Sequence, residues 1–344
     1  MKNLIFLILT LLAWPGGGCG AAKAGAQAAE ACGQAAEAAC AEAEAPAAEA
    51  AVPDGEWAVV NTSSVFMRGE ASYTAENVSQ SRMGTPVQVL ARTGYWVKIR
   101  TPEPYEGWVN ELTLAPYPAD YRSCKRYICV REHSFVYAEP SLGAARLSDL
   151  SMSDIVKAAA AGKAGAKAGN ASGKDGWAAV QLWDGRRGWV PAADLADFAN
   201  WIADSEYRAQ VAEIVATARR FLGSPYMWGG MSAGLFDCSG LVGFCYFMAG
   251  IQLPRDASQQ IGCGVPVDFE DMQAGDLVFF GEKRVGHVAL CTSPGRIIHS
   301  SQIVRENSLV PSEPDYYGRH IIGIRRIIGH LPEQNFIKNS TLYF

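Results

Sequence analysis

The stretch Phe236-Asp237-Cys238-Ser239-Gly240 is followed at once by the apolar run LVGFCYFM at residues 241–248. A cysteine between acidic and small residues, at the start of a long apolar segment, predicts a thiol in the first turn of a buried helix. The unpaired amide N–H groups and the helix dipole at such a position favour thiolate over thiol. We therefore interpret Cys238 as a candidate nucleophile. A lone cysteine before an apolar helix is more often structural, so this interpretation depends on its partners.

Downstream of the cysteine, three β-type segments predict an antiparallel meander. They read GDLVFF at 275–280, VGHVALC at 285–291 and RIIHS at 296–300, and the turn residues Ser293-Pro294-Gly295 separate the last two. Upstream of the cysteine, apolar residues recur at three- and four-residue steps after Ser205, which predicts an amphipathic helix that Ser205 caps.

Two histidines lie in the predicted hairpin. His287 and His299 are symmetric about residue 293, so in a regular hairpin they face one another on one side of the sheet, with Cβ atoms about 5 Å apart. A bulge that shifts the pairing by one residue would turn His299 to the opposite face. With Cys238, the two histidines fit a nucleophile, a base and a group that orients the base.

Composition narrows the classes of function. At 344 residues, with 49% hydrophobic content, the chain is long enough for two or three domains. The formal net charge is −5, and no cluster of Lys and Arg with interleaved aromatic residues occurs, so we expect no nucleic-acid partner. Neither CxxC pairs nor His/Cys clusters with zinc spacing occur, and we expect no metal and no other cofactor.

The nine cysteines are an odd number without regular spacing, which does not indicate a disulfide-rich fold. Two pairs that are close in sequence are candidates for disulfides, namely Cys124 with Cys129 and Cys32 with Cys40. The sequence decides neither pair.

Residues 1–18 have the pattern of an export signal, with a lysine, an apolar run from Leu4 to Trp14 and then small residues. The run is too short for a membrane span. Two outcomes remain open: cleavage and release, or acylation of Cys19 as in bacterial lipoproteins, with membrane attachment through the lipid. Gly16 departs from the lipoprotein pattern, which usually has an aliphatic residue there. We expect a periplasmic or membrane-anchored protein.

Residues 19–52 are dominated by alanine, with interspersed Glu, Gln and Gly, and lack a stripe of larger apolar residues. Alanine favours helix, but nothing in this segment would anchor a helix to a core. We interpret the segment as a tether that is helical in part.

Short β-type runs separated by turn residues follow, and they occur twice. Met83 and Met152 are 69 positions apart, whereas the Gly-Trp-Val motifs at 107–109 and 188–190 are 81 positions apart. Two constant offsets that differ by twelve residues indicate one duplication with one insertion. The Ala-, Gly- and Lys-rich segment 158–176 is that insertion and predicts a long surface loop.

Both copies resemble the bacterial SH3-like domain, a small β-barrel whose strands end in this Gly-Trp-Val motif. The match covers residues 56 to 198. We expect the four tryptophans of the two copies to pack in the barrel cores rather than to stack on a ligand. They are Trp96, Trp108, Trp177 and Trp189.

Residues 205 to 332 resemble the NlpC-type bacterial cell-wall cysteine peptidases, a papain-like family. Five ordered motifs carry the resemblance: GSPYMWGG at 223–230, FDCSGLV at 236–242, LPRD at 253–256, AGDLVFF at 274–280 and GHVA at 286–289. The fold class that follows is multidomain, with two small SH3-like barrels before an α+β papain-like peptidase. The expected domains are 53–120, 121–198 and 199–334, and residues 335–344 form a tail.

The resemblance implies the roles of the site residues. Cys238 is the nucleophile, His287 the base and His299 the polar residue that orients it. Tyr226 stands beside the thiol and, with the Cys238 N–H, stabilises the oxyanion, while Trp228 walls the substrate groove. The neighbours of the cysteine, Asp237 and Ser239, are further candidates for substrate binding.

Two SH3-like domains before such a peptidase are similar to the murein-recycling γ-D-glutamyl-L-diamino acid endopeptidases. The resemblance implies a peptidoglycan-derived murein peptide with a free N-terminal L-alanine, whose amine Asp256 recognises. Asp256 also fits a helix N-cap, and both roles are compatible. Glu76 and Tyr121 are the candidates in the first barrel for contact with substrate. The sequence does not show whether the diamino acid is diaminopimelate or lysine.

Two rival functions remain. One is a non-catalytic protein that binds peptidoglycan through its barrels, and the other is an amidase or acyltransferase that uses the same thiol.

Overall fold

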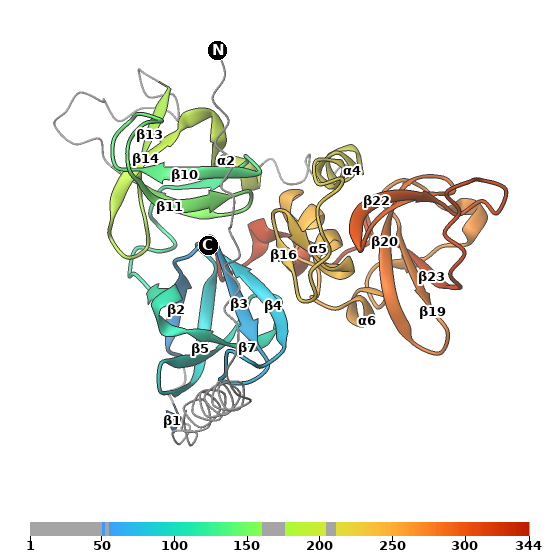
Figure 1. Ribbon diagram of the computed structural model, residues 1–344, viewed down its shortest axis with the longest axis horizontal. Coiled ribbons are helices and arrows are strands. Elements are labelled where there is room, and N and C mark those ends of the chain that lie inside the picture. Colours follow the sequence, from blue (N-terminus) through green and yellow to red (C-terminus); the bar gives the residue numbers. More distant parts are fainter. Residues whose placement is uncertain (1–49, 52–54, 160–175, 204–210, 344) are drawn as a thin grey trace, which may run out of the picture. The chain divides into compact units, whose positions relative to one another are not determined.

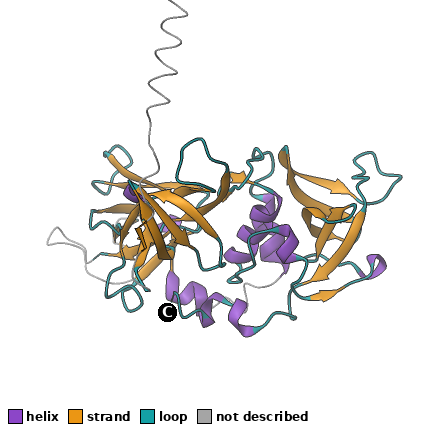
Figure 2. Ribbon diagram, turned by 90° about the horizontal axis from the view of Figure 1, so that it is seen from below, coloured by secondary structure: helices purple, strands orange, loops and turns teal. Residues whose placement is uncertain are grey.

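The computed structural model describes residues 50–51, 55–159, 176–203 and 211–343. The predicted export signal with Cys19, the pair Cys32 and Cys40, most of the insertion and the predicted cap Ser205 lie outside this part of the chain. Two all-β units come first in the described chain and an α+β unit follows them, as the elements in Figures 1 and 2 show.

The first unit is a small barrel whose strand order is β4-β3-β7-β6-β5-β2-β8, with β1 paired to β5. Alternate residues point inward along each strand, so that a core of valines with Met67 and Ile99 fills the barrel. β1 falls within the segment that we predicted to be a tether. The strands are β1 (Ala50–Ala51), β2 (Trp57–Val60), β3 (Ser64–Arg68), β4 (Asn77–Arg82), β5 (Pro86–Thr93), β6 (Trp96–Arg100), β7 (Glu106–Asn110) and β8 (Leu114–Pro116).

The second unit repeats the first. Its strand order, β11-β10-β14-β13-β12-β9-β15, is the order of the first barrel taken strand by strand, which confirms the predicted duplication. Trp96 and Trp108 are buried as expected, whereas Trp177 and Trp189 are only partly buried. The strands are β9 (Arg126–Cys129), β10 (His133–Tyr137), β11 (Arg146–Ser151), β12 (Ile155–Ala158), β13 (Trp177–Gln181), β14 (Arg187–Pro191) and β15 (Leu195–Asp197).

The third unit combines short helices with a six-stranded antiparallel sheet of order β18-β23-β19-β20-β21-β22. The predicted meander is its centre, formed by β19 (Leu277–Gly281), β20 (Val285–Ser293) and β21 (Arg296–Ser301). The remaining elements are α2 (Phe198–Ala203), α4 (Val211–Arg219), β16 (Met231–Ser232), β17 (Leu235–Phe236), α5 (Cys238–Met248), α6 (Ala257–Gln260), β18 (Val265–Pro266), β22 (Ile303–Ser308) and β23 (Ile321–Arg326).

Helix α5 is the central element of this unit. Apart from Cys238 and Gly243 all its residues are buried, because its sequence is apolar on every side, and it packs against α4, β20 and β21. Each fully buried Leu or Phe contributes about 1.5–3 kcal/mol of transfer free energy. The prediction of a buried helix that begins at the cysteine is confirmed.

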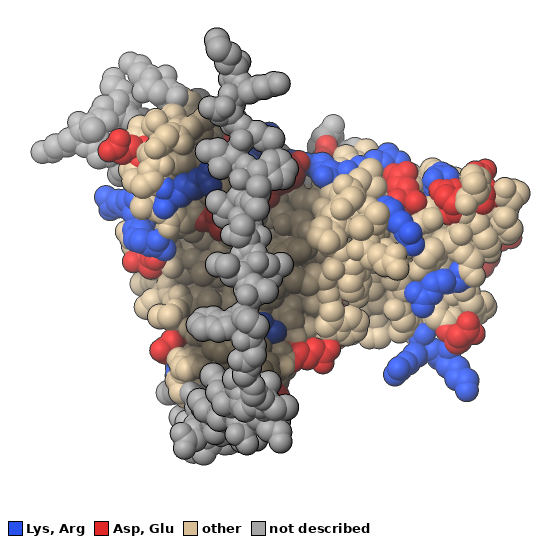
Figure 3. Space-filling view, in the orientation of Figure 1, with Lys and Arg blue, Asp and Glu red and all other residues tan. Residues whose placement is uncertain are grey.

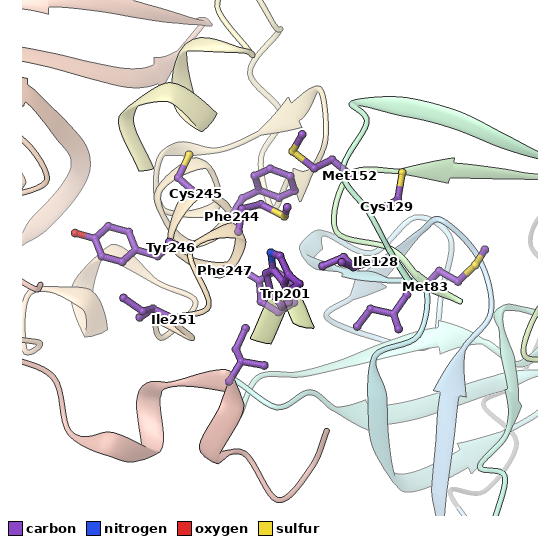
Figure 4. Close-up of a cluster of buried hydrophobic side chains, with 14 of the residues drawn as sticks. Met83, Ile128, Cys129, Met152, Trp201, Phe244, Cys245, Tyr246, Phe247 and Ile251 are labelled. Carbon is purple, nitrogen blue, oxygen red and sulfur yellow. The ribbon is translucent and has the colours of Figure 1, made fainter. Parts of the chain in front are cut away.

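A single cluster of buried apolar side chains continues from the second barrel into the third unit. Figure 4 shows Trp201 of α2 between Phe247 of α5 and Ile128 of β9, with Met83 of the first barrel nearby. The predicted C-terminal tail belongs to this cluster, since Tyr343 is 1% exposed and its backbone oxygen accepts a hydrogen bond from Arg126. The segment predicted as a C-terminal tail thus packs through Tyr343 against Phe198 and Phe247.

Two further predictions concern covalent and membrane structure. Cys124 and Cys129 are both free thiols, and each donates to a nearby backbone oxygen, so they form no disulfide. Within the described ranges, no helix is long and apolar enough to cross a membrane.

Candidate active site

Cys238 is the first residue of α5. Asp237 before it is extended and caps the helix, because its Oδ1 accepts a hydrogen bond from Gly240 N–H at 2.7 Å. The chain before the helix passes close to it, so that a Cβ on Gly240 would lie 1.9 Å from the backbone oxygen of Gly230. Cys238 as a residue is partly exposed, whereas its neighbours Asp237 and Ser239 are buried.

The Cys238 sulfur lies against the histidine strand. The backbone N–H of Val288, the residue after His287, hydrogen-bonds to it. Burial and, secondly, Asp237 raise the pKa of the thiol, and these effects outweigh the N–H groups of Val288 and Ser239, which lower it. The N–H at the helix start therefore acts in the expected direction, but burial outweighs it and the pKa of the Cys238 thiol lies above its usual value.

His287 and His299 meet on one face of the sheet. His287 Nε2 lies 2.7 Å from His299 Nδ1, and the rings are edge to face with centroids 5.0 Å apart. His299 Nε2 lies 2.9 Å from Oδ1 of Asn307 on β22. The three side chains form one hydrogen-bonded row that the sequence predicted only as far as His299.

The pairing of the hairpin differs from the prediction. Leu290 pairs with Ile298, and continuing that register places Ala289, not His287, opposite His299. An irregularity between Cys291 and Ser293 shifts the hairpin centre. The displacement along the strands is two residues, an even number, so both histidines still point to the same face.

Both histidines are buried and rest uncharged. Burial, followed by His299 and Arg319, lowers the pKa of His287 to about 3. Burial lowers the pKa of His299 to about 4, although its hydrogen bond to Asn307 acts in the opposite direction. Tyr317 covers the pair, with its ring centroid 4.4 Å from that of His299. A neutral imidazole is the state in which a general base can accept a proton.

Tyr226 lies beside Cys238, as the resemblance implies. A bridge between Tyr226 and Phe236 holds its backbone next to the start of α5. Burial, followed by Cys238 and Asp237, raises the pKa of the Tyr226 hydroxyl to about 12. The hydroxyl is therefore protonated at neutral pH and available as a donor.

The first barrel reaches the peptidase unit at Trp228. The indole Nε1 of Trp228 donates to Glu76 Oε1 at 2.6 Å, and Asn77 Nδ2 donates to the Trp228 backbone oxygen at 2.9 Å. The Trp228 side chain is 62% exposed. Glu76 and Trp228, two of the residues predicted to bind substrate, thus contact each other.

Asp256 is at the N-cap position of α6, and its N–H donates to Gln259 Oε1. Its carboxylate accepts a hydrogen bond from Tyr105, a residue between β6 and β7 that we did not predict. Burial, followed by Asp237, raises the pKa of Asp256, and Arg255 and Tyr105 oppose this shift. Burial also raises the pKa of Tyr105, and Asp256 and Glu76 add to the effect.

Tyr121 is not at this site. It is fully buried, its hydroxyl donates to the Gly84 backbone oxygen at 2.6 Å, and its ring packs against Trp183 of the second barrel. The prediction that Tyr121 contacts substrate is wrong, because the ring fills the space between the barrels. Tyr105 is the barrel tyrosine that reaches the peptidase.

Asp237 and Ser239 are buried beneath the helix start instead of facing a groove. Arg255 donates to Asp237 Oδ2 at 2.6 Å and to Ser239 Oγ at 3.0 Å, and its Nε donates to Ser79 Oγ of the first barrel at 2.9 Å. Gln80 next to Ser79 accepts three hydrogen bonds from Met231 and Ser232. These contacts bind the barrel to the chain that leads into Cys238, and their side chains are not free to contact a substrate.

Charges of both signs are interspersed on the face of the molecule in Figure 3 that the grey atoms do not cover. Within the described chain, no cluster of three His, Cys, Asp or Glu side chains could hold a metal.

Comparison with known proteins agrees with this geometry. Residues 223–326 match the NlpC/P60 family and residues 63–115 match the bacterial SH3 domain. The chain is 29% identical over 271 residues to a gamma-D-glutamyl-L-lysine dipeptidyl-peptidase of Bacillus cereus (strain ATCC 10987 / NRS 248), covering 73% of this chain and 75% of that protein. It is 26% identical over 265 residues to the protein of the same name from Bacillus subtilis (strain 168), covering 73% and 82%.

The fold is also that of a solved structure. The crystal structure of an NlpC/P60 family protein from Bacillus cereus ATCC 10987 superposes with a TM-score of 0.64 at 23% identity, covering 79% of this chain and 99% of that one. The chain therefore carries a bacterial SH3 domain and, after it, a cysteine peptidase domain of the NlpC/P60 family. The predicted architecture is confirmed.

Proposed function

We propose that this cell-wall peptidase of the NlpC/P60 family cleaves murein peptides between γ-D-glutamate and the following diamino acid. Cys238 is the nucleophile, His287 the base and His299 the residue that orients the base. The observation that carries the proposal is the hydrogen bond between His287 and His299, together with the hydrogen bond from Val288 N–H, next to His287, to the Cys238 sulfur at a helix start.

The reaction is acyl transfer through a thioester. His287 takes the thiol proton as the Cys238 sulfur bonds to the γ-D-glutamyl carbonyl carbon, and the resulting oxyanion accepts hydrogen bonds from Tyr226 and from the Cys238 N–H. The C–N bond then breaks as His287 delivers its proton to the leaving amine. Water attacks the thioester and gives a proton to His287, which returns it to the departing sulfur.

Recognition of a free amino terminus is the finer part of the proposal. Asp256 and Glu76 both act electrostatically on Tyr105, so the two carboxylates lie near the same side chain. A carboxylate that is partly buried binds an ammonium group strongly and disfavours the neutral amide of a peptide still joined to glycan. The names of the two Bacillus proteins are consistent with a γ-D-glutamyl bond, and the diamino acid is left open between lysine and diaminopimelate.

The test uses L-Ala-γ-D-Glu-diamino acid and its N-acetylated form, with products identified by mass spectrometry. The free peptide should be cut with a kcat/KM at least about tenfold higher than the acetylated one, since each 1.4 kcal/mol of differential binding is a factor of ten. Asp256→Asn should remove that preference, whereas Asp268→Asn, at an exposed carboxylate, should keep it. Equal cleavage of both peptides by the unaltered protein would remove the claim about the amine.

We also propose export, with residues 1–18 as the signal and Cys19 as a site of acylation. The basis is the sequence pattern, since these residues lie outside the described chain. Incorporation of labelled palmitate that is lost in Cys19→Ala would support acylation, and a soluble, unlabelled mature protein would show cleavage alone.

A further inference from the structure

Asn307 extends the histidine row by one residue beyond those used in the mechanism above. It lies at the end of β22, where its Oδ1 is 2.9 Å from His299 Nε2 and its Nδ2 is 2.7 Å from the backbone oxygen of Asp315. The segment around Asp315 is itself held to β22, because Ser308 N–H donates to the Asp315 oxygen and Tyr317 N–H donates to the Ser308 oxygen. Both ends of the Asn307 amide are therefore engaged.

The orientation of this amide follows from its partners. A backbone carbonyl oxygen only accepts hydrogen bonds, so the group that faces the Asp315 oxygen must be the NH₂ of Asn307. The amide oxygen then faces His299, and it too can only accept. His299 Nε2 must therefore carry a proton.

The tautomers of both rings follow. Burial keeps His299 neutral, and a neutral imidazole has one N–H, so its Nδ1 is an acceptor. His287 Nε2, 2.7 Å away, must donate to that lone pair and thus carries the proton of its own neutral ring. His287 Nδ1 remains unprotonated.

We propose that Asn307 is a positioning residue that fixes the tautomers of His299 and His287, so that Nδ1 of His287 is the nitrogen that takes the proton of the Cys238 thiol. This inference rests on the proposed peptidase function. Without the Asn307 oxygen, His299 could place its proton on Nδ1. His287 Nε2 would then accept, and its own proton would move to Nδ1, where it blocks the base.

Other charged or titratable groups act on the pair from several elements. They are Arg305 on β22, Tyr317 and Arg319 between β22 and β23, and Cys238 on α5. The cations among these groups are Arg305 and Arg319. An arginine only donates hydrogen bonds, so neither of them can replace the Asn307 oxygen as the acceptor for His299.

Two variants separate the acceptor from the rest of the side chain. Asn307→Leu and Asn307→Asp both lose the donor to Asp315, but only Asp keeps an acceptor for His299. Asn307→Leu should lower kcat about 100- to 10,000-fold at every pH with KM changed less than about threefold, which is the range that a general base contributes. Asn307→Asp should keep a maximal kcat within about tenfold of that of the unaltered protein. The pH below which its kcat falls should rise by about one unit or more, because a carboxylate favours protonated His299.

A full-length protein labelled with ¹⁵N in histidine provides a readout that needs no substrate. Long-range ¹H–¹⁵N correlations should show protons on Nε2 of both rings in the unaltered protein, and a mixture of tautomers in Asn307→Leu. A proton on Nδ1 of His299 in the unaltered protein would overturn the inference, even if Asn307→Leu did not fold. A folded Asn307→Leu variant with unchanged kcat would also overturn the inference. The same is true if kcat of the two variants falls at the same acidic pH. Failure to cleave any murein peptide would instead count against the proposed function.

Discussion

The catalytic pair proposed for this protein rests as a neutral thiol and a neutral imidazole. Burial raises the pKa of Cys238 and lowers that of His287 to about 3. The proton therefore moves only when the sulfur attacks the substrate, and the row behind His287 must stabilise the imidazolium that forms.

The pH dependence of kcat follows from these shifts. Protonation of His287 or His299, whose pKa values are lowered to about 3 and about 4, removes the base, so kcat should persist down to about pH 4 and fall below it. The lowered pKa values also affect stability. Below the ordinary histidine pKa of about 6.5 the unfolded chain binds protons at these two residues, whereas the folded protein does not. The free energy of unfolding should therefore decrease as the pH falls from about 6.5 to about 4. Stopped assays from pH 3 to 9, with folding monitored by circular dichroism, measure both. A kcat that falls to half its maximum near pH 6.5 would contradict this account.

The Tyr226 hydroxyl is expected to act on the transition state. Because its pKa is raised to about 12, it remains a donor throughout the assay range. Tyr226→Phe should lower kcat about 100- to 1000-fold with little change in KM, as loss of one oxyanion donor does elsewhere. Tyr95→Phe, at an exposed tyrosine of the first barrel, should leave kcat unchanged. Equal kcat for both variants would exclude Tyr226 from the oxyanion site.

The limits of prediction from sequence are clear at this scale. Cys238, His287 and His299 could be placed together because helix start and strand periodicity determine where their side chains point. Asn307 could not, because it reaches His299 through a second hairpin whose turn at Gln302, with φ of 66°, has no glycine signal. Tyr105 and Tyr121 are both barrel tyrosines, and only tertiary packing decides which one faces the peptidase.

At the scale of elements, the start of α5 depends on close contact with the preceding chain. A Cβ on Gly240 would lie 1.9 Å from the Gly230 oxygen, whereas at Gly243, in the same helix, the nearest atom would be 3.8 Å away. Gly240→Ala should therefore displace the helix start and abolish activity, with a stability loss above about 2 kcal/mol.

Gly243→Ala is the matched control. It should be active and neutral or more stable by up to about 1 kcal/mol, since alanine favours helix over glycine. Thermal unfolding and peptide turnover measured on both variants test this difference. Similar losses in the two would show that the helix, rather than its first turn, is sensitive to added volume.

The strands of both barrels and of the meander were predictable because short apolar alternation and turn residues mark them locally. The hairpin register was not, because the irregularity after Cys291 has no signal in the sequence. His287 and His299 still lie on the same face of the sheet, because the register differs from the prediction by an even number of residues. A one-residue shift would have separated the histidines.

At the scale of the whole molecule, the barrels and the peptidase share buried structure. Arg255 joins Ser79 of the first barrel to Asp237 below the nucleophile, and Tyr343 from the C-terminal segment packs against Phe198 and Phe247. The barrels are therefore expected to support the active site as well as to border it. The sequence predicted three domains, but it did not predict that one buried cluster joins them.

The C-terminal segment offers a test of this continuity. Tyr343→Ala should destabilise the protein by about 3–5 kcal/mol, because it removes a fully buried aromatic ring. Thr341→Ala, two residues earlier at an exposed position, should change stability by less than about 0.5 kcal/mol. Chemical denaturation monitored by tryptophan fluorescence compares the two, and equal midpoints would contradict the packing described here.

The central claim is that Cys238 forms the acyl-enzyme during hydrolysis of a γ-D-glutamyl bond. The most direct measurement is mass spectrometry of the products that full-length protein releases from L-Ala-γ-D-Glu-diamino acid, beside Cys238→Ala and the control Cys263→Ala. We expect the dipeptide L-Ala-γ-D-Glu and the free diamino acid from the unaltered protein and from Cys263→Ala, and turnover at least about 10³-fold lower from folded Cys238→Ala. Sustained release of the same products by Cys238→Ala would contradict the account.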